Sequence, residues 1–214
     1  AYLDAIGMGS TAMTLPTADG SANQVLKTDG SGTLSWTTNS GSGGASSVTG
    51  LSDALVEDNS VYVGNDPSST TSTAQYNVAL GSTALDAITE GDYNTAVGHN
   101  AMTAHTTGNY STAIGADAML ANTTGAYNTA LGSASLKANT TGERNIAVGN
   151  NALDSNTTAS SNIAVGTEAL NGNTTGTRNI AIGDAALNVP DTENDNLAIG
   201  YNALGGSIAG GEFN

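Results

Sequence analysis

The sequence has no cysteine, few cations and few aromatic side chains. Without cysteine, no disulfide framework can hold the fold. Aromatic residues make up 4% and charged residues 11% of the chain, whereas glycine alone accounts for 28 of its 214 residues. So few large apolar side chains cannot fill a thick globular core, and the low charge content argues against generic disorder. The composition therefore predicts a thin fold with a core of small residues.

Only four residues are Lys or Arg, and the formal net charge is −15. Phosphate binding needs clustered cations, so we expect neither nucleic acid nor an anionic membrane surface as a partner. No apolar run approaches the ~18 residues of a spanning helix, so no membrane insertion is expected. The chain starts at Ala1 rather than Met, and we interpret it as a fragment or a processed form.

One 17-residue phrase recurs eight times without insertion from Val78 onward. Each copy opens with four residues that we number positions 1 to 4: a β-branched or aliphatic residue, Ala, an aliphatic residue and Gly. The openings are Val78-Ala79-Leu80-Gly81, Thr95-Ala96-Val97-Gly98, Thr112-Ala113-Ile114-Gly115, Thr129-Ala130-Leu131-Gly132, Ile146-Ala147-Val148-Gly149, Ile163-Ala164-Val165-Gly166, Ile180-Ala181-Ile182-Gly183 and Leu197-Ala198-Ile199-Gly200. An invariant period indicates that each copy is one structural unit stacked on the next.

The opening residues alternate in size. In an extended segment, positions 1 and 3 share one face, and we expect these side chains, with the Leu or Met at position 8, to form the core. Positions 2 and 4 are kept small, which predicts another backbone packed closely against them. We therefore predict close packing or an oligomer interface at Ala79, Gly81, Ala96, Gly98, Ala113, Gly115, Ala130, Gly132, Ala147, Gly149, Ala164, Gly166, Ala181, Gly183, Ala198 and Gly200.

Asn and Thr residues recur between these segments. Asn-Thr-Thr begins at Asn122, Asn139, Asn156 and Asn173 (position 11). Position 17, counted from Asn77 just before the first copy to Asn196, is Asn in every turn except at Ser111. Stacked Asn side chains can hydrogen-bond to one another as a ladder. The Asn-Thr-Thr triplets also match glycosylation acceptors, but their fixed phase favours a role in the corners.

The repeat predicts an all-β fold, a β-solenoid or parallel β-roll with two short strands in each turn. Eight turns spaced by ~4.8 Å give a rod of roughly 35–40 Å. A helical alternative fails because no apolar residues recur at helical spacing. Before the repeats we predict a small β-rich N-terminal unit at 1–39, with a strand at 33–37, and a Gly/Ser linker at 40–47. An entry cap at 48–77 would contain a short helix at 51–56 and a strand at 60–64, followed by the solenoid at 78–214.

A single chain of this kind buries little. Three modest side chains in each turn contribute ~1.5–3 kcal/mol each, whereas ordering 17 residues costs on the order of 20 kcal/mol. Backbone ladders offset part of this difference. We therefore expect an intertwined or laterally packed homotrimer.

Two families resemble this sequence. The phrase Ile-Ala-Val-Gly-x-x-Ala-Leu is similar to the head repeats of trimeric autotransporter adhesins, which form left-handed parallel β-rolls assembled as trimers. The segments 15–20, 23–26, 29–36 and 60–67 resemble phage tail fibres. These resemblances imply a trimeric virion appendage or, alternatively, the adhesive head of a bacterial surface protein.

Few residues suggest chemistry. His99 and His105 are the only histidines, and no partner positions recur, so we expect them at the surface or in corners. Asp86, Asp92, Asp117, Asp154, Asp184, Asp191, Glu193 and Asp195 lack the fixed spacing of a catalytic pair or a calcium loop. Tyr93, Tyr110 and Tyr127 share position 16 and predict a core or interface stripe; the alternative is a patch that contacts glycans.

The sequence thus predicts a non-enzymatic structural segment of a phage tail fibre or related virion appendage. It would act as a rigid spacer, self-assembled as a homotrimer, with other virion tail proteins as neighbours and a host surface glycan or receptor as a further contact. No cofactor or metal is expected. The alternatives are the bacterial adhesin head, at the cell surface, and, less favoured, a glycan-degrading tailspike or an ice-binding protein, the last suggested by the recurring Thr pairs.

Overall fold

The computed structural model describes residues 5–8, 11–14, 16–17, 24–28, 31, 33–38, 54–64, 73–189 and 192–206. These residues form strands and turns without a helix, which confirms the all-β class. The chain divides into two compact units, Ala1–Gly50 and Leu51–Asn214. The linker predicted at 40–47 lies outside the described residues.

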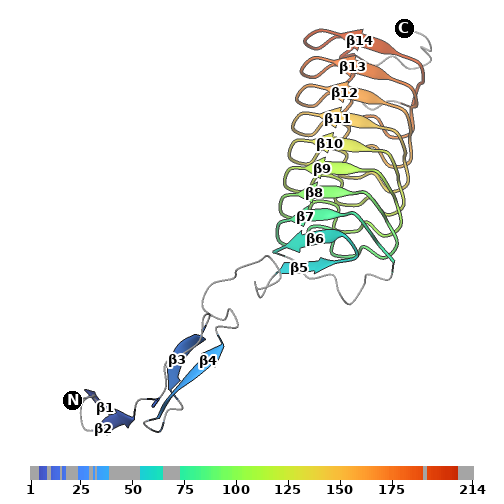
Figure 1. Ribbon diagram of the computed structural model, residues 1–214. Helices are drawn as coiled ribbons and strands as arrows, with labels where there is room; N and C mark the ends of the chain where they lie inside the picture. Colours follow the sequence, from blue (N-terminus) through green and yellow to red (C-terminus); the bar gives the residue numbers. More distant parts are fainter. Residues whose placement is uncertain are drawn as a thin grey trace. The chain divides into compact units, whose positions relative to one another are not determined.

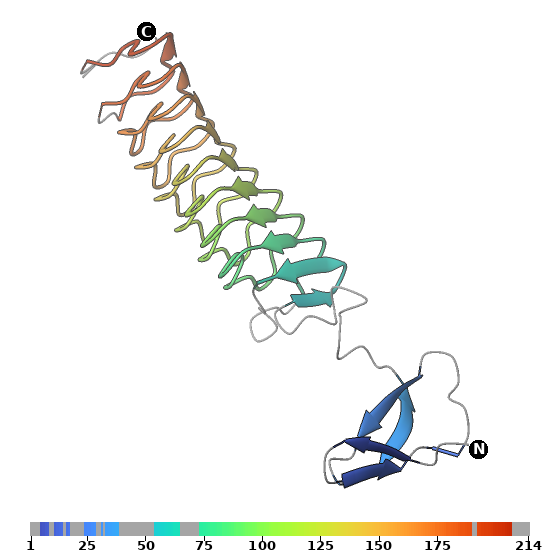
Figure 2. The ribbon, with the colours of Figure 1, turned by 90° about the vertical axis from the view of Figure 1, so that its left-hand side faces the viewer.

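The first unit contains two antiparallel hairpins (Figures 1 and 2). Strand β1 (Ala5–Met8) pairs with β2 (Thr11–Thr14), and β3 (Gln24–Thr28) pairs with β4 (Leu34–Thr38). The strand predicted at 33–37 is therefore confirmed by β4.

The second unit is a solenoid whose strands form one ten-stranded sheet along its length (Figure 1). From β6 onward each strand pairs in parallel with the strand seventeen residues later, so that Ala130, for example, lies between Ala113 and Ala147. The strands are β5 (Ala54–Glu57), β6 (Ser60–Val63), β7 (Val78–Leu80), β8 (Thr95–Val97), β9 (Thr112–Ile114), β10 (Thr129–Leu131), β11 (Ile146–Val148), β12 (Ile163–Val165), β13 (Ile180–Ile182) and β14 (Leu197–Ile199). The predicted β-solenoid with a 17-residue turn is confirmed.

The solenoid begins with a hairpin. Strand β5 pairs antiparallel with β6, which then pairs in parallel with β7. The helix predicted at 51–56 is therefore wrong where the chain is described, because residues 54–57 form β5. The strand predicted at 60–64 is confirmed by β6.

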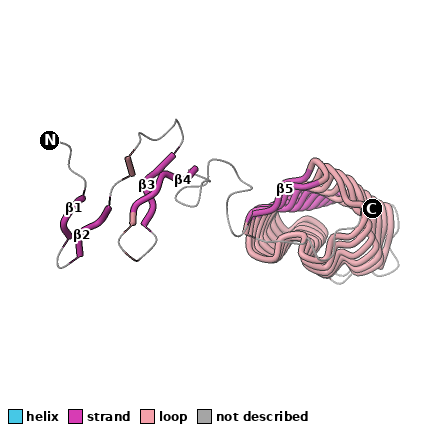
Figure 3. The backbone as a smooth tube through the Cα atoms, turned by 60° about the horizontal axis from the view of Figure 1, so that its bottom comes forward, coloured by secondary structure: helices cyan, strands magenta, loops and turns pink. Residues whose placement is uncertain are grey.

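In its described residues each repeat contains one strand and not the two that we predicted. Position 8 lies in a turn, and its residues adopt the left-handed conformation with φ between 48° and 54°. Position 6 has similar φ values, 53° to 59°. These two left-handed residues fold the chain back towards the axis, and the position 8 side chain enters the core, fully buried from Leu85 to Leu187. Figure 3 shows the sheet along one side of the coil and loops around the rest.

The sheet faces the opposite way from our prediction. The Ala at position 2 is at most 2% exposed in all eight turns, whereas positions 1 and 3 are half-buried or exposed. The core is therefore built from Ala at positions 2 and 7 with Leu or Met at position 8. The Ala residues predicted as an oligomer interface are covered by their own chain, so they cannot form the surface of one.

The glycines at position 4 are closely packed, but against the next turn and not against a lateral partner. Their φ values lie between 122° and 142°, a region that residues with a Cβ rarely adopt. A Cβ on Gly98 would lie 2.6 Å from the carbonyl oxygen of Gly115. The small residues at positions 2 and 4 therefore reflect the narrow interior and the axial stacking of a single chain.

Candidate functional site

The main candidate is the outer face of the parallel sheet, made by positions 16, 1 and 3 of each turn, which we call the outward face. These positions alternate with the buried positions 17 and 2, as expected for an extended chain. Position 3 is apolar in all eight turns, and several of its side chains are strongly exposed, such as Leu80 at 51% and Ile199 at 65%. A contiguous exposed apolar strip of this length is characteristic of an interaction surface.

A stack of four tyrosines forms one edge of the outward face. Tyr76, Tyr93, Tyr110 and Tyr127 follow one another at ring-centroid separations of 4.7, 5.0 and 5.2 Å, with interplanar angles of at most 13°. The Arg144 guanidinium continues the row, 5.4 Å from the Tyr127 ring centroid. The rings are about half-exposed. The predicted aromatic stripe therefore exists, and it lies at the surface and not in the core.

The stack restricts how these tyrosines can contact a glycan. Both ring faces of Tyr93 and of Tyr110 are covered by neighbouring tyrosines, so only their edges and hydroxyl groups are accessible to a ligand. The predicted glycan contact at Tyr93, Tyr110 and Tyr127 stays a prediction, limited to contacts with these edges.

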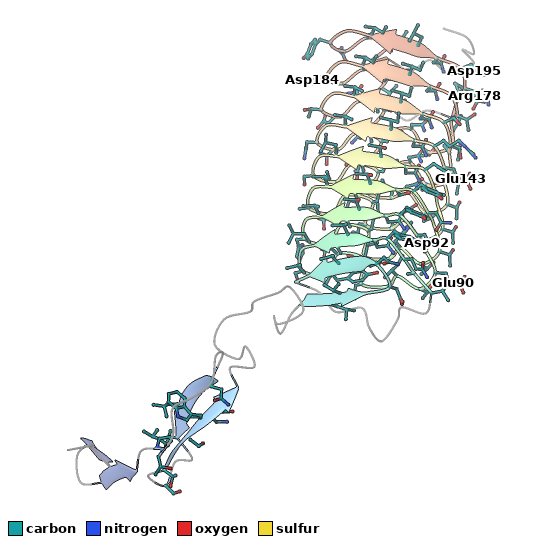
Figure 4. All side chains as sticks on the ribbon, in the orientation of Figure 1. Glu90, Asp92, Glu143, Arg178, Asp184 and Asp195 are labelled. Carbon is teal, nitrogen blue, oxygen red and sulfur yellow. The ribbon has the colours of Figure 1, made fainter. Side chains whose placement is uncertain are left out.

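Charged side chains occur on the outward face only at position 16, along its edge. Arg144 pairs with Glu143 at 2.9 Å, and Arg178 binds both carboxylate oxygens of Asp195 at 2.6 Å. The hydrogen-bonded Arg178 guanidinium holds the pKa of the Asp195 carboxyl below its usual range. Figure 4 shows Glu143, Arg178 and Asp195 along one edge of the sheet, opposite Asp184. Positions 1 and 3 carry no charge in any turn.

Two buried columns of Asn hold the corners. At position 17 each side chain bonds backbone: Asn145 Nδ2 donates to the Ala159 carbonyl at 2.8 Å, and its Oδ1 accepts the Asn162 N–H at 3.0 Å. At position 11 the side chains bond one another, as in Asn156 Nδ2 to Asn139 Oδ1 at 2.9 Å. The Asn–Asn ladder predicted at position 17 thus occurs mainly at position 11. The four Asn-Thr-Thr asparagines are fully buried, so they serve the corners and are closed to glycosylation in the folded chain.

His105 occupies position 11 and is fully buried, whereas His99 is exposed. The predicted surface or corner location is confirmed for both histidines, since His99 lies at the surface and His105 in a corner, where it is buried. Its Nε2 lies 2.8 Å from the Gly108 carbonyl, and its Nδ1 lies 2.8 Å from Asn122 Nδ2. A carbonyl only accepts and Asn122 Nδ2 donates, so we assign the proton to Nε2 of a neutral ring. Burial lowers the pKa of His105.

This buried imidazole predicts acid sensitivity. Because the pKa is lower in the folded chain than the ~6.5 of the unfolded chain, only the unfolded state gains a proton as the pH first falls below ~6.5. Folding stability is then lost by up to ~1.4 kcal/mol per pH unit until the folded pKa is reached. The measurement is urea unfolding at pH 8 and pH 5 of the wild type and of His105→Asn, which restores the residue that four other turns have at position 11. We expect a steeper loss in the wild type; parallel losses would contradict this assignment.

Several of the remaining polar side chains hydrogen-bond to the backbone of neighbouring turns. Within the described ranges, no three His, Asp or Glu residues lie close enough to hold a metal ion. Asp92 accepts the Gln75 N–H, and Asp184 accepts the Thr167 N–H. The hydroxyl groups of Thr106, Thr123, Thr140 and Thr157 at position 12 donate to carbonyls of the next turn. These hydroxyl groups therefore join successive turns.

Comparisons with protein-family models, curated proteins and solved structures found no match to this chain. Among the described residues, no helix is long and apolar enough to cross a membrane.

Proposed function

We propose that this chain is a structural segment of a phage tail fibre or related virion appendage, a rigid, non-enzymatic spacer that assembles as a homotrimer. The observation that carries the proposal is the unbroken parallel stack from β6 to β14, in which every turn repeats the same register. Such a stack has a length set by the number of turns, as a spacer requires. In this role the segment holds a host-binding tip away from the virion, next to other tail proteins.

Self-association is supported by the outward face. A monomer would leave this apolar strip in water along the whole solenoid, from Val78 at 46% exposed to Ile199 at 65%. Burying it in a partner is favourable by about 25 cal/mol per Å² of apolar surface. The resemblance to trimeric adhesin heads and tail fibres supports three copies. The surface that joins the copies is then formed by positions 1 and 3 and not by the Ala and Gly residues.

The second candidate is an adhesive head on a bacterial surface. The half-exposed tyrosine edges favour it, because aromatic residues are enriched at binding surfaces. The adhesive role needs the turns that carry the tyrosines for attachment, whereas the spacer role needs no particular turn.

Deletion of one whole turn tests the spacer proposal. Removal of residues 95–111 from the complete appendage joins Asn94 to Thr112 in phase, removes Tyr110 from the tyrosine stack and shortens the rod by ~4.8 Å. We expect a folded appendage of unchanged oligomeric state that still attaches to its host. The control deletion, 96–111, shifts the register by one residue and moves inward side chains outward, so it should not fold. Loss of attachment with the fold retained after the in-phase deletion would favour the adhesive role and contradict the spacer.

A further inference from the structure

The apolar part of the outward face changes position halfway along the solenoid. In the first four turns position 16 is Tyr, and position 1 is Thr in three of them. In the last four turns position 16 is polar, and position 1 is Ile or Leu. The paired residues, position 16 then position 1, are Tyr76 and Val78, Tyr93 and Thr95, Tyr110 and Thr112, Tyr127 and Thr129, Arg144 and Ile146, Ser161 and Ile163, Arg178 and Ile180, Asp195 and Leu197. With position 3, every turn therefore presents at least two large apolar side chains.

The fold of a single chain does not require that an apolar residue at position 16 be replaced by one at position 1. Position 16 has the same left-handed backbone whatever its residue, with φ of 58° at Tyr127, 56° at Arg144 and 64° at Ser161. This conformation favours Asn or Gly over an aromatic residue. The residues at positions 16 and 1 point out of the solenoid and do not fill its core. A compensation between them therefore indicates that something outside the chain contacts both.

We propose that the Tyr76–Tyr127 stack is a contact with a second copy of this chain, which lies parallel and unshifted against the outward face. In the first four turns the tyrosines at position 16 supply the apolar contact with the second copy. In the last four turns Ile and Leu at position 1 supply it. The inference rests on the proposed self-association and adds which residues join the copies and in which register.

The size of the outward face is sufficient for such a contact. Five residues from position 16 to position 3 span about 16 Å, and eight turns span about 35 Å, or roughly 550 Å² on each copy. Two copies thus bury about 1,100 Å² together, above the ~1,000 Å² that a specific interface needs.

The distribution of charge on the chain also favours a second copy as the partner. Each copy carries a net charge of −15, so two copies repel each other except where their surfaces are neutral. Positions 1 and 3 are uncharged throughout, and Arg144 and Arg178 at the edge are already paired with Glu143 and Asp195. The outward face is therefore a surface on which two acidic chains can meet.

The shift of the apolar residue from position 16 to position 1 also defines the register between the two copies. The step from tyrosine to polar residues occurs at one height, between Tyr127 and Arg144, and all turns have the same spacing. Copies related by a rotation axis parallel to the solenoid place this step at equal heights. Tyrosine turns then meet tyrosine turns, and Ile turns meet Ile turns.

The test replaces the Tyr and Thr pair of one turn, at positions 16 and 1, by the Arg and Ile pair of a later turn. Tyr110→Arg alone removes the aromatic contact, whereas Tyr110→Arg with Thr112→Ile gives that turn the pair found at Arg144 and Ile146. Tyr201→Arg is the matched control, because Tyr201 is 85% exposed at position 5, outside the outward face. Sedimentation equilibrium of the whole chain should show self-association weakened by at least ~10-fold in the single variant. We expect the double variant to recover most of this loss and the control to match the wild type.

Nitration of the unmodified chain provides a measurement that does not depend on any variant. At concentrations where the chain is assembled, Tyr93 and Tyr110 should react at least ~10-fold more slowly than at dilutions where it is monomeric, while Tyr201 reacts equally in both. Assembly that is unchanged in the single variant, with tyrosine reactivity independent of concentration, would overturn this inference and leave the proposed homotrimer standing. A wild-type chain that stays monomeric at every concentration would instead overturn the proposed homotrimer itself.

Discussion

Replacing Gly132 with alanine is expected to cost about 4 kcal/mol or more of folding stability. Gly132 has a φ of 139°, a conformation essentially restricted to glycine. A Cβ at this residue would also collide with the backbone carbonyl of Gly149 in the next turn. That carbonyl cannot move away freely, because the Gly149 N–H donates to Leu131 at 2.8 Å. Strain and collision therefore add at the same residue.

Gly200→Ala is the control that separates the two effects. Gly200 has a φ of 122°, but a Cβ there would meet no atom within 4 Å. Only the conformational cost of ~1–3 kcal/mol should remain. Urea unfolding of both variants, monitored by circular dichroism, gives the comparison. Similar losses in the two variants would mean that successive turns are not packed as closely as described.

Replacing Asn145 with alanine should be the next most damaging change, with a loss of about 2–4 kcal/mol. The Asn145 side chain is fully buried, donates to the Ala159 carbonyl and accepts the Asn162 N–H. Its removal leaves the buried Asn162 N–H without a partner, which costs ~1–3 kcal/mol. It also removes one of the two bonds to the Ala159 carbonyl, which still accepts from Asn156 Nδ2 at 3.1 Å, and that loss costs a further ~0.5–1.5 kcal/mol. The two losses lie at one corner and disconnect two neighbouring turns.

The one turn that has serine in place of Asn at position 17 suggests the control. Ser111 occupies this position and accepts the Asn128 N–H through Oγ at 3.2 Å. Asn145→Ser should therefore retain the bond to Asn162 and lose only the bond to Ala159, whose carbonyl still accepts from Asn156. We expect less than half the effect of alanine. Ser111→Asn should stabilise the chain. The measurement is thermal unfolding of the three variants, and equal destabilisation by Ala and Ser would contradict the ladder.

Much of this fold follows from the sequence because the repeat has a constant period. A spacing of seventeen residues determines which residues stack, so Ala130 is bound to lie next to Ala113 and Ala147. Hydrogen-bonded corners also follow, since a buried amide that recurs in phase finds a partner in the next turn.

The direction of each face was harder to predict. Apolar size suggested that positions 1 and 3 face the core, but the narrow interior beside the strand accepts only Ala79 and its equivalents. One signal in the sequence could have shown this. Positions 17, 2 and 4 lie on the same side of an extended chain, so a buried Asn at position 17 places the Ala inside and the Ile outside.

The second predicted strand failed for a different reason. Leu136 is apolar and follows a small residue, a pattern typical of a strand edge, yet its φ is 51°. Aliphatic residues seldom adopt this conformation, and only the stacked turns on both sides impose it. The tyrosine stack could be predicted from position 16 alone, but its exposure depends on the direction of the faces.

The molar mass of the wild-type chain in solution, measured by light scattering across a dilution series, tests the central claim most directly. The proposed homotrimer of a 21.0 kDa chain is a particle of about 63 kDa that dissociates on dilution. A folded particle of 21.0 kDa at every concentration would contradict the account.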